Sequence, residues 1–224
     1  MQLDTSGCDF SGLYTVLNAE FGFLNWWPAE SREEVVAGAI LTQQASWKNV
    51  ETAIQNLKNA DVLNVKSMAE INLKTLESLV KPSGFYRQKA RRLKNFMNHV
   101  YKKYHTLDNF FDKTSEELRL ELLELEGVGK ETADSILLYA AEKPVFVIDA
   151  YTLRIVERIY GFKMDYDDLQ KLIESRIERR LSLYKDFHAQ FVELGKRFCK
   201  TKPICEGCPA SVFCKFKNKN SKNR

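Results

Sequence analysis

Two stretches of this 224-residue sequence hold residue types that could do chemistry. In the first, residues 125–129 (LEGVG), two glycines leave backbone amides uncovered by side chains just before an expected helix. Free amides at the start of a helix bind anions, and a phosphate is a suitable ligand. In the second, Asp149 follows the apolar run 145–148, which would hold its carboxylate at the edge of a dry pocket. Capping of the next helix is the alternative role for this aspartate.

Four cysteines near the end of the sequence form another candidate site. They have the spacing Cys-x5-Cys-x2-Cys-x5-Cys within sixteen residues, in basic surroundings that favour thiolates. The metal ligands would be Cys199, Cys205, Cys208 and Cys214. Zinc and an iron–sulfur cluster both use four thiolates, but the pattern lacks the paired Cys-x2-Cys knuckles usual for structural zinc. Disulfides are disfavoured in an intracellular chain, and the remote Cys8 is expected to be a small buried residue.

Composition restricts the class of protein. The chain has 44% hydrophobic and 29% charged residues, which is typical of a globular protein long enough for one large core or two small ones. The apolar run 35–41 is too short to cross a bilayer, and the first residues lack a basic segment followed by an apolar one. We therefore expect neither secretion nor membrane insertion.

The net charge of +4 is unevenly distributed along the chain. Residues 81–103 contain eight Lys or Arg and no acid, and residues 196–224 contain nine that only Glu206 opposes. Either run alone would be typical of a solvated helix face or of a disordered basic tail. The two runs together favour binding to a nucleic acid.

The elements that must position these residues are helices. Apolar residues recur at three- and four-residue intervals in several segments, and no alternating strand pattern is evident. The segments are 33–43, 47–58, 88–101, 131–141 and 184–197. Helix starts are predicted at Ser31, at Thr114 with Glu117 as a capping box, and at Asp165. Helices without strands bury their faces against one another, so we expect an all-α fold with two lobes.

Residues 125–155 resemble the helix-hairpin-helix DNA glycosylase superfamily, the relatives of endonuclease III. That family has a Leu-x-Gly-Val-Gly hairpin followed by a catalytic aspartate, at the spacing found here between Gly129 and Asp149. The similarity extends over nearly the whole chain. It implies that Gly127, Val128 and Gly129 hold a phosphate beside the damaged nucleotide, and that Asp149 is the essential carboxylate. A fixed negative charge in a low-dielectric site stabilises the cationic sugar that forms when an N-glycosidic bond breaks.

The resemblance also bears on strand cleavage. Family members that cut the strand carry a lysine two residues after the second hairpin glycine, and this sequence has Glu131 there. Lys130 lies one residue earlier, which is a rotation of about 100° on a helix, so its side chain should point away from Asp149. We therefore expect a monofunctional glycosylase that leaves an abasic site.

A second likeness concerns segments 25–28, 41–47 and 81–90. These resemble the 3-methyladenine DNA glycosylases related to endonuclease III, which also carry glutamate in place of the lysine. The resemblance implies that Trp47 stacks on the extruded base, and indole faces attract cationic alkylated purines by about 1–2 kcal/mol when water is excluded. The other residues expected at the base pocket are Trp26, Trp27, Pro28 and Glu131. Ordinary core packing is the alternative for the two neighbouring tryptophans.

Two glutamines at the C-terminal end of the helix expected at 33–43 complete the expected nucleic-acid contacts. The resemblance implies that Gln44 enters the gap left by the extruded base and that Gln43 contacts the opposite strand. A solvated side chain is the alternative for both. The full set of expected DNA-binding residues is Gln43, Gln44, Gly127, Val128, Gly129 and Lys130.

The implied architecture is a two-lobed helix-hairpin-helix glycosylase fold, with a DNA cleft between the lobes and a C-terminal [4Fe–4S] loop. The family's terminal pattern is Cys-x6-Cys-x2-Cys-x5-Cys, from which this sequence departs by one residue in the first spacer. The cluster is expected to be structural. The expected divisions are a helical barrel domain ending in the helix-hairpin-helix (29–130), a second helical domain (1–28 plus 131–198), the cluster loop (199–214) and a basic tail (215–224).

These inferences predict a monofunctional DNA glycosylase of base excision repair that releases alkylated purines such as 3-methyladenine. Its partner would be double-stranded DNA containing a damaged base, and we expect a cytoplasmic, nucleoid-associated monomer. Two alternatives stay open. One keeps the fold but removes mismatched uracil or thymine, or mispaired adenine. The other is a non-catalytic DNA-binding or redox-sensing iron–sulfur module.

Overall fold

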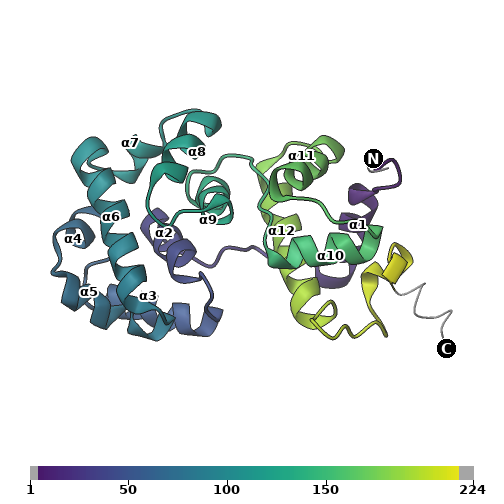
Figure 1. Cartoon of the computed structure of the whole chain (residues 1–224), viewed down its shortest axis with the longest axis horizontal. Helices are drawn as coiled ribbons and strands as arrows, with labels where there is room; N and C mark the ends of the chain where they lie inside the picture. Colours follow the sequence, from purple (N-terminus) through teal and green to yellow (C-terminus); the bar gives the residue numbers. More distant parts are fainter. Residues whose placement is uncertain (1–4, 217–224) are drawn as a thin grey trace. The chain divides into compact units, whose positions relative to one another are not determined.

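The computed structural model describes residues 5–216, and over this range every regular element is a helix (Figure 1). The predicted all-α fold is therefore confirmed. Contacts divide the chain into two compact units. We call Trp27–Lys143 the central unit, and Met1–Trp26 together with Pro144–Arg224 the terminal unit. Most of the predicted basic tail, residues 217–224, lies outside the described range.

The central unit is built from short helices around one long one, α6. α6 packs against α4 and α5 on one side and also contacts α2 and α7. The elements are α2 (Arg32–Leu41), α3 (Trp47–Asn59), α4 (Val65–Glu70), α5 (Leu73–Leu79), the 3-10 turn η1 (Lys81–Ser83), α6 (Tyr86–Tyr104), α7 (Leu107–Phe111), α8 (Ser115–Glu124), α9 (Lys130–Ser135) and the π-helix η2 (Ile136–Ala140).

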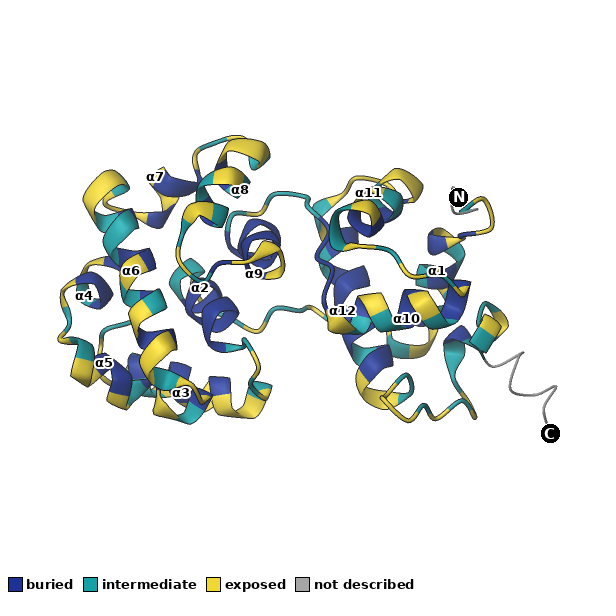
Figure 2. Cartoon of the chain, viewed as in Figure 1, coloured by how far each residue is buried: buried dark blue, intermediate teal, exposed yellow. Residues whose placement is uncertain are grey.

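Helix α2 forms the core of the central unit. Its N-cap is Ser31, as predicted, whose hydroxyl accepts the Glu34 N–H, and every residue from Glu34 to Leu41 is buried (Figure 2). A helix that is buried on all sides must lie among other elements rather than on a surface. The two predicted caps further along the chain, Thr114 and Asp165, are confirmed as well, the first with its complete capping box.

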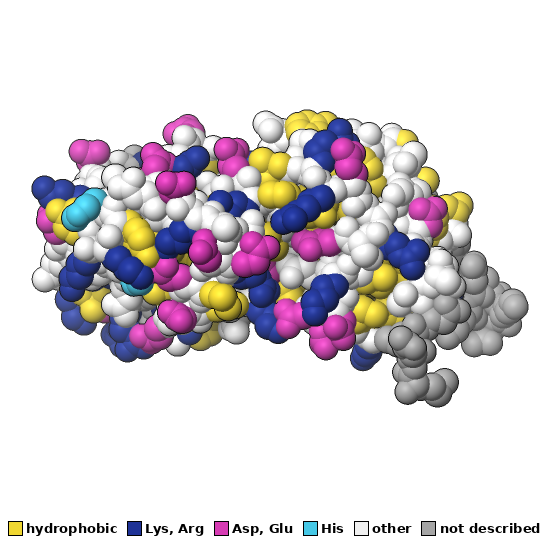
Figure 3. Space-filling view, turned by 90° about the horizontal axis from the view of Figure 1, so that it is seen from above, with side chains coloured by type: hydrophobic (Ala, Val, Ile, Leu, Met, Phe, Trp, Pro, Cys, Tyr) yellow, Lys and Arg dark blue, Asp and Glu magenta, His cyan; other side chains and the backbone are white. Residues whose placement is uncertain are grey.

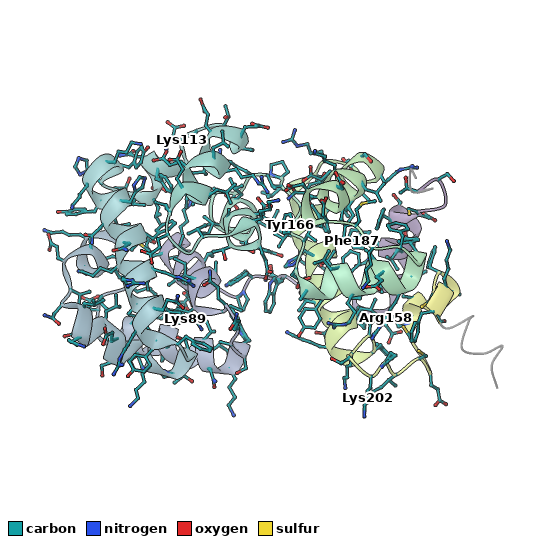
Figure 4. All side chains as sticks on the ribbon, in the orientation of Figure 1. Lys89, Lys113, Arg158, Tyr166, Phe187 and Lys202 are labelled. Carbon is teal, nitrogen blue, oxygen red and sulfur yellow. The ribbon has the colours of Figure 1, made fainter. Side chains whose placement is uncertain are left out.

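The terminal unit contains α1 (Phe10–Phe21), α10 (Ala150–Tyr160), α11 (Tyr166–Arg176), α12 (Leu181–Arg197) and the 3-10 turn η3 (Pro209–Val212). α12 packs against α1 and α10, and it supplies the buried rings of Phe187 and Phe191 to a cluster completed by Phe146 (Figure 4). Phe146 belongs to the apolar run that precedes Asp149, so this run is anchored in the core by its aromatic side chain.

The boundaries of the compact units differ from the predicted domain boundaries. The sequence places a division after residue 130, whereas residues 131–143 group with the central unit. The physical reason is that η2 packs against α2 and α8 of the central unit, where all of its side chains are buried. None of the helices between residues 5 and 216 combines the length and the apolar character needed to cross a membrane.

A charge network on Glu121 ties α8 to α6. The carboxylate accepts hydrogen bonds from the Tyr104 hydroxyl at 2.7 Å and from Lys103 Nζ at 2.9 Å, lies 2.7 Å from His99 Nε2, and also pairs with Lys113 (Figure 4). Burial alone would raise the pKa of Glu121, but the Lys113, Lys103, Tyr104 and His99 side chains lower it well below the ordinary glutamate value. The carboxylate is thus stabilised in its ionised form.

We predict that Glu121→Gln lowers the free energy of unfolding by about 1.5–3 kcal/mol near neutral pH, the usual range for hydrogen bonds to a charged group. Because the folded-state pKa is depressed, this stabilisation is fully present above the unfolded pKa of about 4.3 and declines progressively as the pH falls from there through the folded-state pKa, so the penalty should be smaller at the lower pH. Urea titrations at about pH 7 and about pH 3 measure the difference. Glu124→Gln, an exposed change on the same helix, is the control. A penalty that is the same at both pH values would contradict the prediction.

Candidate active site

The hairpin between α8 and α9 is held in one conformation by two constraints on Gly127. Its φ of +80° lies in the left-handed region, and a Cβ atom here would lie 2.1 Å from Arg92 Nε. Val128 is buried, and its N–H donates to Leu125 O at 3.0 Å. Gly129 is exposed, has an extended backbone and forms the N-cap of α9. Only Gly127 therefore requires glycine for both its φ and its contacts.

The predicted contacts Gln43 and Gln44 differ in their surroundings although they are neighbours. Gln43 donates from Nε2 to Gly127 O at 2.9 Å and to Thr132 Oγ1 at 3.0 Å, and its Oε1 accepts from Arg92 Nη1 at 2.7 Å. Gln44 is exposed and has a φ of +52°. The side chain of Gln43 thus lies within the central unit, and that of Gln44 faces solvent.

Lys130 and Glu131 occupy the first turn of α9, and both are exposed. The carboxylate of Glu131 lies near the N-terminal end of the helix, where the helix dipole favours a negative charge. Position 131 therefore carries a carboxylate and not an amine.

Three aromatic rings meet in the central unit. The indole of Trp27 contacts that of Trp47 edge to face, with centroids 5.3 Å apart, and lies 5.3 Å from the ring of Tyr139 on η2. The ring of Trp27 also rests on Gly38, where a Cβ atom would approach it to 3.1 Å. π-helical turns such as η2 are frequent at functional sites. We call Trp27, Trp47 and Tyr139 the aromatic cluster.

The predicted pocket residues Pro28 and Trp26 have different surroundings. Pro28 is exposed. Trp26 belongs to the terminal unit, where Lys196 Nζ lies 5.1 Å above its ring. The Nε1 atom of the half-buried Trp47 donates to Glu51 Oε1 at 2.6 Å, which fixes the plane of its ring.

In the terminal unit, Asp149 is the N-cap of α10, so the capping role that the sequence left open is confirmed. Its Oδ1 accepts from Thr152 N at 2.7 Å and from Thr152 Oγ1 at 2.8 Å. Oδ2 lies 3.8 Å from Nε2 of His188 on α12. Asp149 is only 8% exposed, and the residues that precede it, Val147 and Ile148, are fully buried.

The electrostatic surroundings keep Asp149 ionised. Burial alone would raise its pKa, but His188 and the N–H and hydroxyl of Thr152 outweigh burial and lower the pKa below the ordinary aspartate value. Capping fixes the carboxylate in position, because rotating it would break two hydrogen bonds at the start of α10. A fixed, ionised carboxylate in a poorly hydrated site can stabilise a positive charge that forms beside it.

Arginines of α10 hold the cysteine loop. Arg154 Nε donates to Cys199 O at 2.8 Å, and Arg158 donates to Cys199 Sγ at 3.3 Å and to Thr201 O at 2.9 Å (Figure 4). Burial, and then the nearby thiols of the other three cysteines, raise the pKa of Cys208 to about 11. Over residues 5–216, no three potential ligands converge on a point where a single metal ion could bind.

Five residues near these sites were not predicted: Arg92, Thr132, Tyr139, Thr152 and His188. A local signal was available only for Thr152, which lies three residues after Asp149 and so completes a capping pattern. His188 stands on the otherwise apolar face of α12, where a lone histidine is usually a core residue.

Basic and acidic side chains mix on one face of the protein. On the face shown in Figure 3, Lys and Arg lie among Asp and Glu rather than in one uniform patch. The modest net charge of +4 agrees with this distribution. Electrostatic attraction to a polyanion would therefore be local rather than global.

Known proteins resemble this chain in both sequence and fold. A protein of Methanocaldococcus jannaschii named "Putative DNA repair glycosylase" is 46% identical over 206 residues, which cover 90% of this chain and 94% of the relative. The 3-methyladenine DNA glycosylase MagIII of H. pylori, in a structure with 1,N6-ethenoadenine, is 33% identical and superposes with a TM-score of 0.77, covering 85% of this chain and 98% of that one.

Endonuclease III in a non-covalent DNA complex superposes with a TM-score of 0.80 at 20% identity, over 99% of this chain and 100% of that one, which shows the fold. A model of the HhH-GPD superfamily of base excision DNA repair proteins matches residues 37–181, a range that includes the hairpin, the aromatic cluster residues Trp47 and Tyr139, and Asp149. The chain therefore belongs to the HhH-GPD superfamily of base excision DNA repair proteins.

Proposed function

We propose that this protein is a monofunctional DNA glycosylase that releases alkylated purines such as 3-methyladenine. The observation that carries the proposal is the ionised, capped carboxylate of Asp149, which follows a buried apolar run. Hydrolysis breaks the bond between C1′ and the base nitrogen, and the base leaves with the bonding electron pair. Asp149 stabilises the cationic sugar and orients a water molecule. The water oxygen bonds to C1′, and its proton passes to the solvent.

The aromatic cluster supports an alkylated purine as the substrate. An alkylated purine such as 3-methyladenine carries a positive charge while it is attached to the sugar, and electron-rich indole rings such as the half-buried Trp47 attract such a cation. Alkylation also weakens the glycosidic bond, so the pocket needs few hydrogen bonds to the base. The likeness to the H. pylori 3-methyladenine glycosylase is consistent with this choice.

The DNA partner is a duplex from which the damaged nucleotide is extruded. Gly127 and Gly129 would present backbone amides to a phosphate, while Val128, whose N–H donates to Leu125 O, would hold the turn between them. The exposed Gln44 would enter the space left by the base. Lys130 lies next to this hairpin on the first turn of α9. We expect the protein to act on this duplex as a monomer.

Strand cleavage is not part of the proposed reaction. A lyase step needs an amine that forms a Schiff base with C1′, and position 131 carries a carboxylate. Lys130 is turned by about 100° from that position on the helix. The product would be an intact strand with an abasic site.

The test uses duplexes that contain methylated purines, uracil or thymine in mismatches, or mispaired adenine. We predict release of 3-methyladenine, identified by chromatography, with strand breaks appearing only after heating in alkali. Absence of any freed purine would overturn the substrate assignment. A covalent adduct trapped with borohydride, present in the wild type and absent in Lys130→Ala, would overturn the monofunctional assignment.

We also propose that Cys199, Cys205, Cys208 and Cys214 bind a [4Fe–4S] cluster. Each thiolate of such a cluster binds a different iron, so the four sulfurs need not converge as they would around a single ion. When bound, the cluster would cross-link the loop, and Arg154 and Arg158 would attach that loop to α10.

Protein purified without oxygen should be yellow-brown, with absorbance near about 400 nm and about four irons per chain. Cys208→Ser should lose the colour, whereas Cys8→Ser, a change at the buried cysteine remote from the loop, should keep it. Stoichiometric zinc in a colourless preparation would contradict the assignment.

A further inference from the structure

Gln43 makes three of its four possible side-chain hydrogen bonds inside the protein. A glutamine amide has two N–H donors and one carbonyl oxygen. Both donors are used, by Gly127 O and Thr132 Oγ1, and the oxygen accepts from Arg92. These three partners lie on the hairpin, on α9 and on α6. One side chain thus joins the hairpin to the two helices beside it.

The chemistry of the partners fixes the orientation of the amide. Reversing the oxygen and nitrogen of Gln43 would place its carbonyl against Gly127 O and its NH₂ group against the cationic Arg92. Both contacts would then be repulsive. A glutamate at this position would keep the partner for Arg92 but would have no donor for Gly127, so the network specifically requires glutamine.

The hairpin is restrained from two sides at Gly127. Its carbonyl oxygen accepts from Gln43, and its Cα is covered by the Arg92 side chain so closely that no Cβ atom fits. Arg92 is itself oriented by its hydrogen bond to Gln43 at 2.7 Å. The direction in which the amides of 127–129 point therefore depends on the amide of residue 43.

The backbone that carries Gln43 is also fixed. Lys89 is 2% exposed, and its Nζ donates to Leu41 O at 2.8 Å and to Ser83 O at 2.6 Å (Figure 4). Lys89 and Arg92 lie three residues apart on α6 and so share one face of that helix. This face holds the end of α2 through Lys89 and the Gln43 side chain through Arg92.

We infer that Gln43 is a positioning residue for the hairpin and does not contact DNA, contrary to its expected role from the sequence. It would act through Gly127, by setting the hairpin amides that the proposed function assigns to a phosphate. The consequence for DNA binding rests on that proposed function. The conformational consequence concerns the free protein alone.

Hydrogen exchange of the free protein tests the inference directly. We expect Gln43→Leu and Gln43→Glu to speed exchange at Val128 and Ala133, whose N–H groups bond to Leu125 O and Gly129 O, by about tenfold or more. Gln44→Leu, the same type of change one residue later, should leave these rates unchanged. Unchanged rates in both Gln43 variants would overturn the inference.

Kinetics with the methylated duplex give the second readout. The Gln43 variants should raise KM by about fivefold or more and change kcat by less than about threefold, because the reacting groups are intact. A lowered kcat with unchanged KM would overturn the positioning role. If the wild type releases no base, the proposed function fails, and the exchange experiment still decides the role of Gln43. Gln43→Glu keeps the test available if Gln43→Leu does not fold.

Discussion

The hydrogen bonds from Thr152 to the Asp149 carboxylate are the interaction on which the proposed chemistry depends. They begin α10 and at the same time hold a negative charge at the end of a buried apolar run. Burying a carboxylate costs several kcal/mol unless charges or hydrogen bonds compensate. Thr152 and His188 supply that compensation, and they lower the pKa of Asp149 despite its burial. The N-cap and the proposed reactive group are therefore the same side chain, so the capping role and the catalytic role considered from the sequence do not exclude each other.

In the central unit, the conformation of the hairpin at residues 127–129 is restrained by neighbouring side chains. Gly127 is required by its left-handed φ and by the Arg92 side chain that covers it, whereas a Cβ atom at Gly129 would have no neighbouring atom within 4 Å. Gln43 connects these parts through an amide whose two N–H groups and carbonyl oxygen all make hydrogen bonds within the central unit. Rigid backbone groups lose little entropy when a ligand binds, so a hairpin fixed in advance favours phosphate binding. The conformation of the hairpin thus depends on the side chains of Gln43 and Arg92 as well as on the hairpin residues themselves.

Features governed by short sequence separations could be predicted, and those governed by distant contacts could not. The caps at Ser31, Thr114 and Asp165 follow from a polar side chain and the N–H groups two or three residues later. The contact of Gln43 with Gly127 spans 84 positions, and Asp149 meets His188 from another helix. No periodicity or spacing reveals such pairs. Tyr139 was missed for the same reason: its helical pattern shows that it is buried but not that Trp27 is its neighbour.

The most direct test of the account is the rate of base release by Asp149→Asn in a single turnover on methylated duplex. Asparagine is as good an N-cap as aspartate, so the variant should fold and bind DNA, and only the charge is lost. We predict a rate at least about 10²-fold below that of the wild type, the effect expected when charge stabilisation of a transition state is removed. Asp165→Asn, the same change at the N-cap of α11, should leave the rate unchanged. Release by Asp149→Asn within about threefold of the wild-type rate would contradict the central role of this carboxylate.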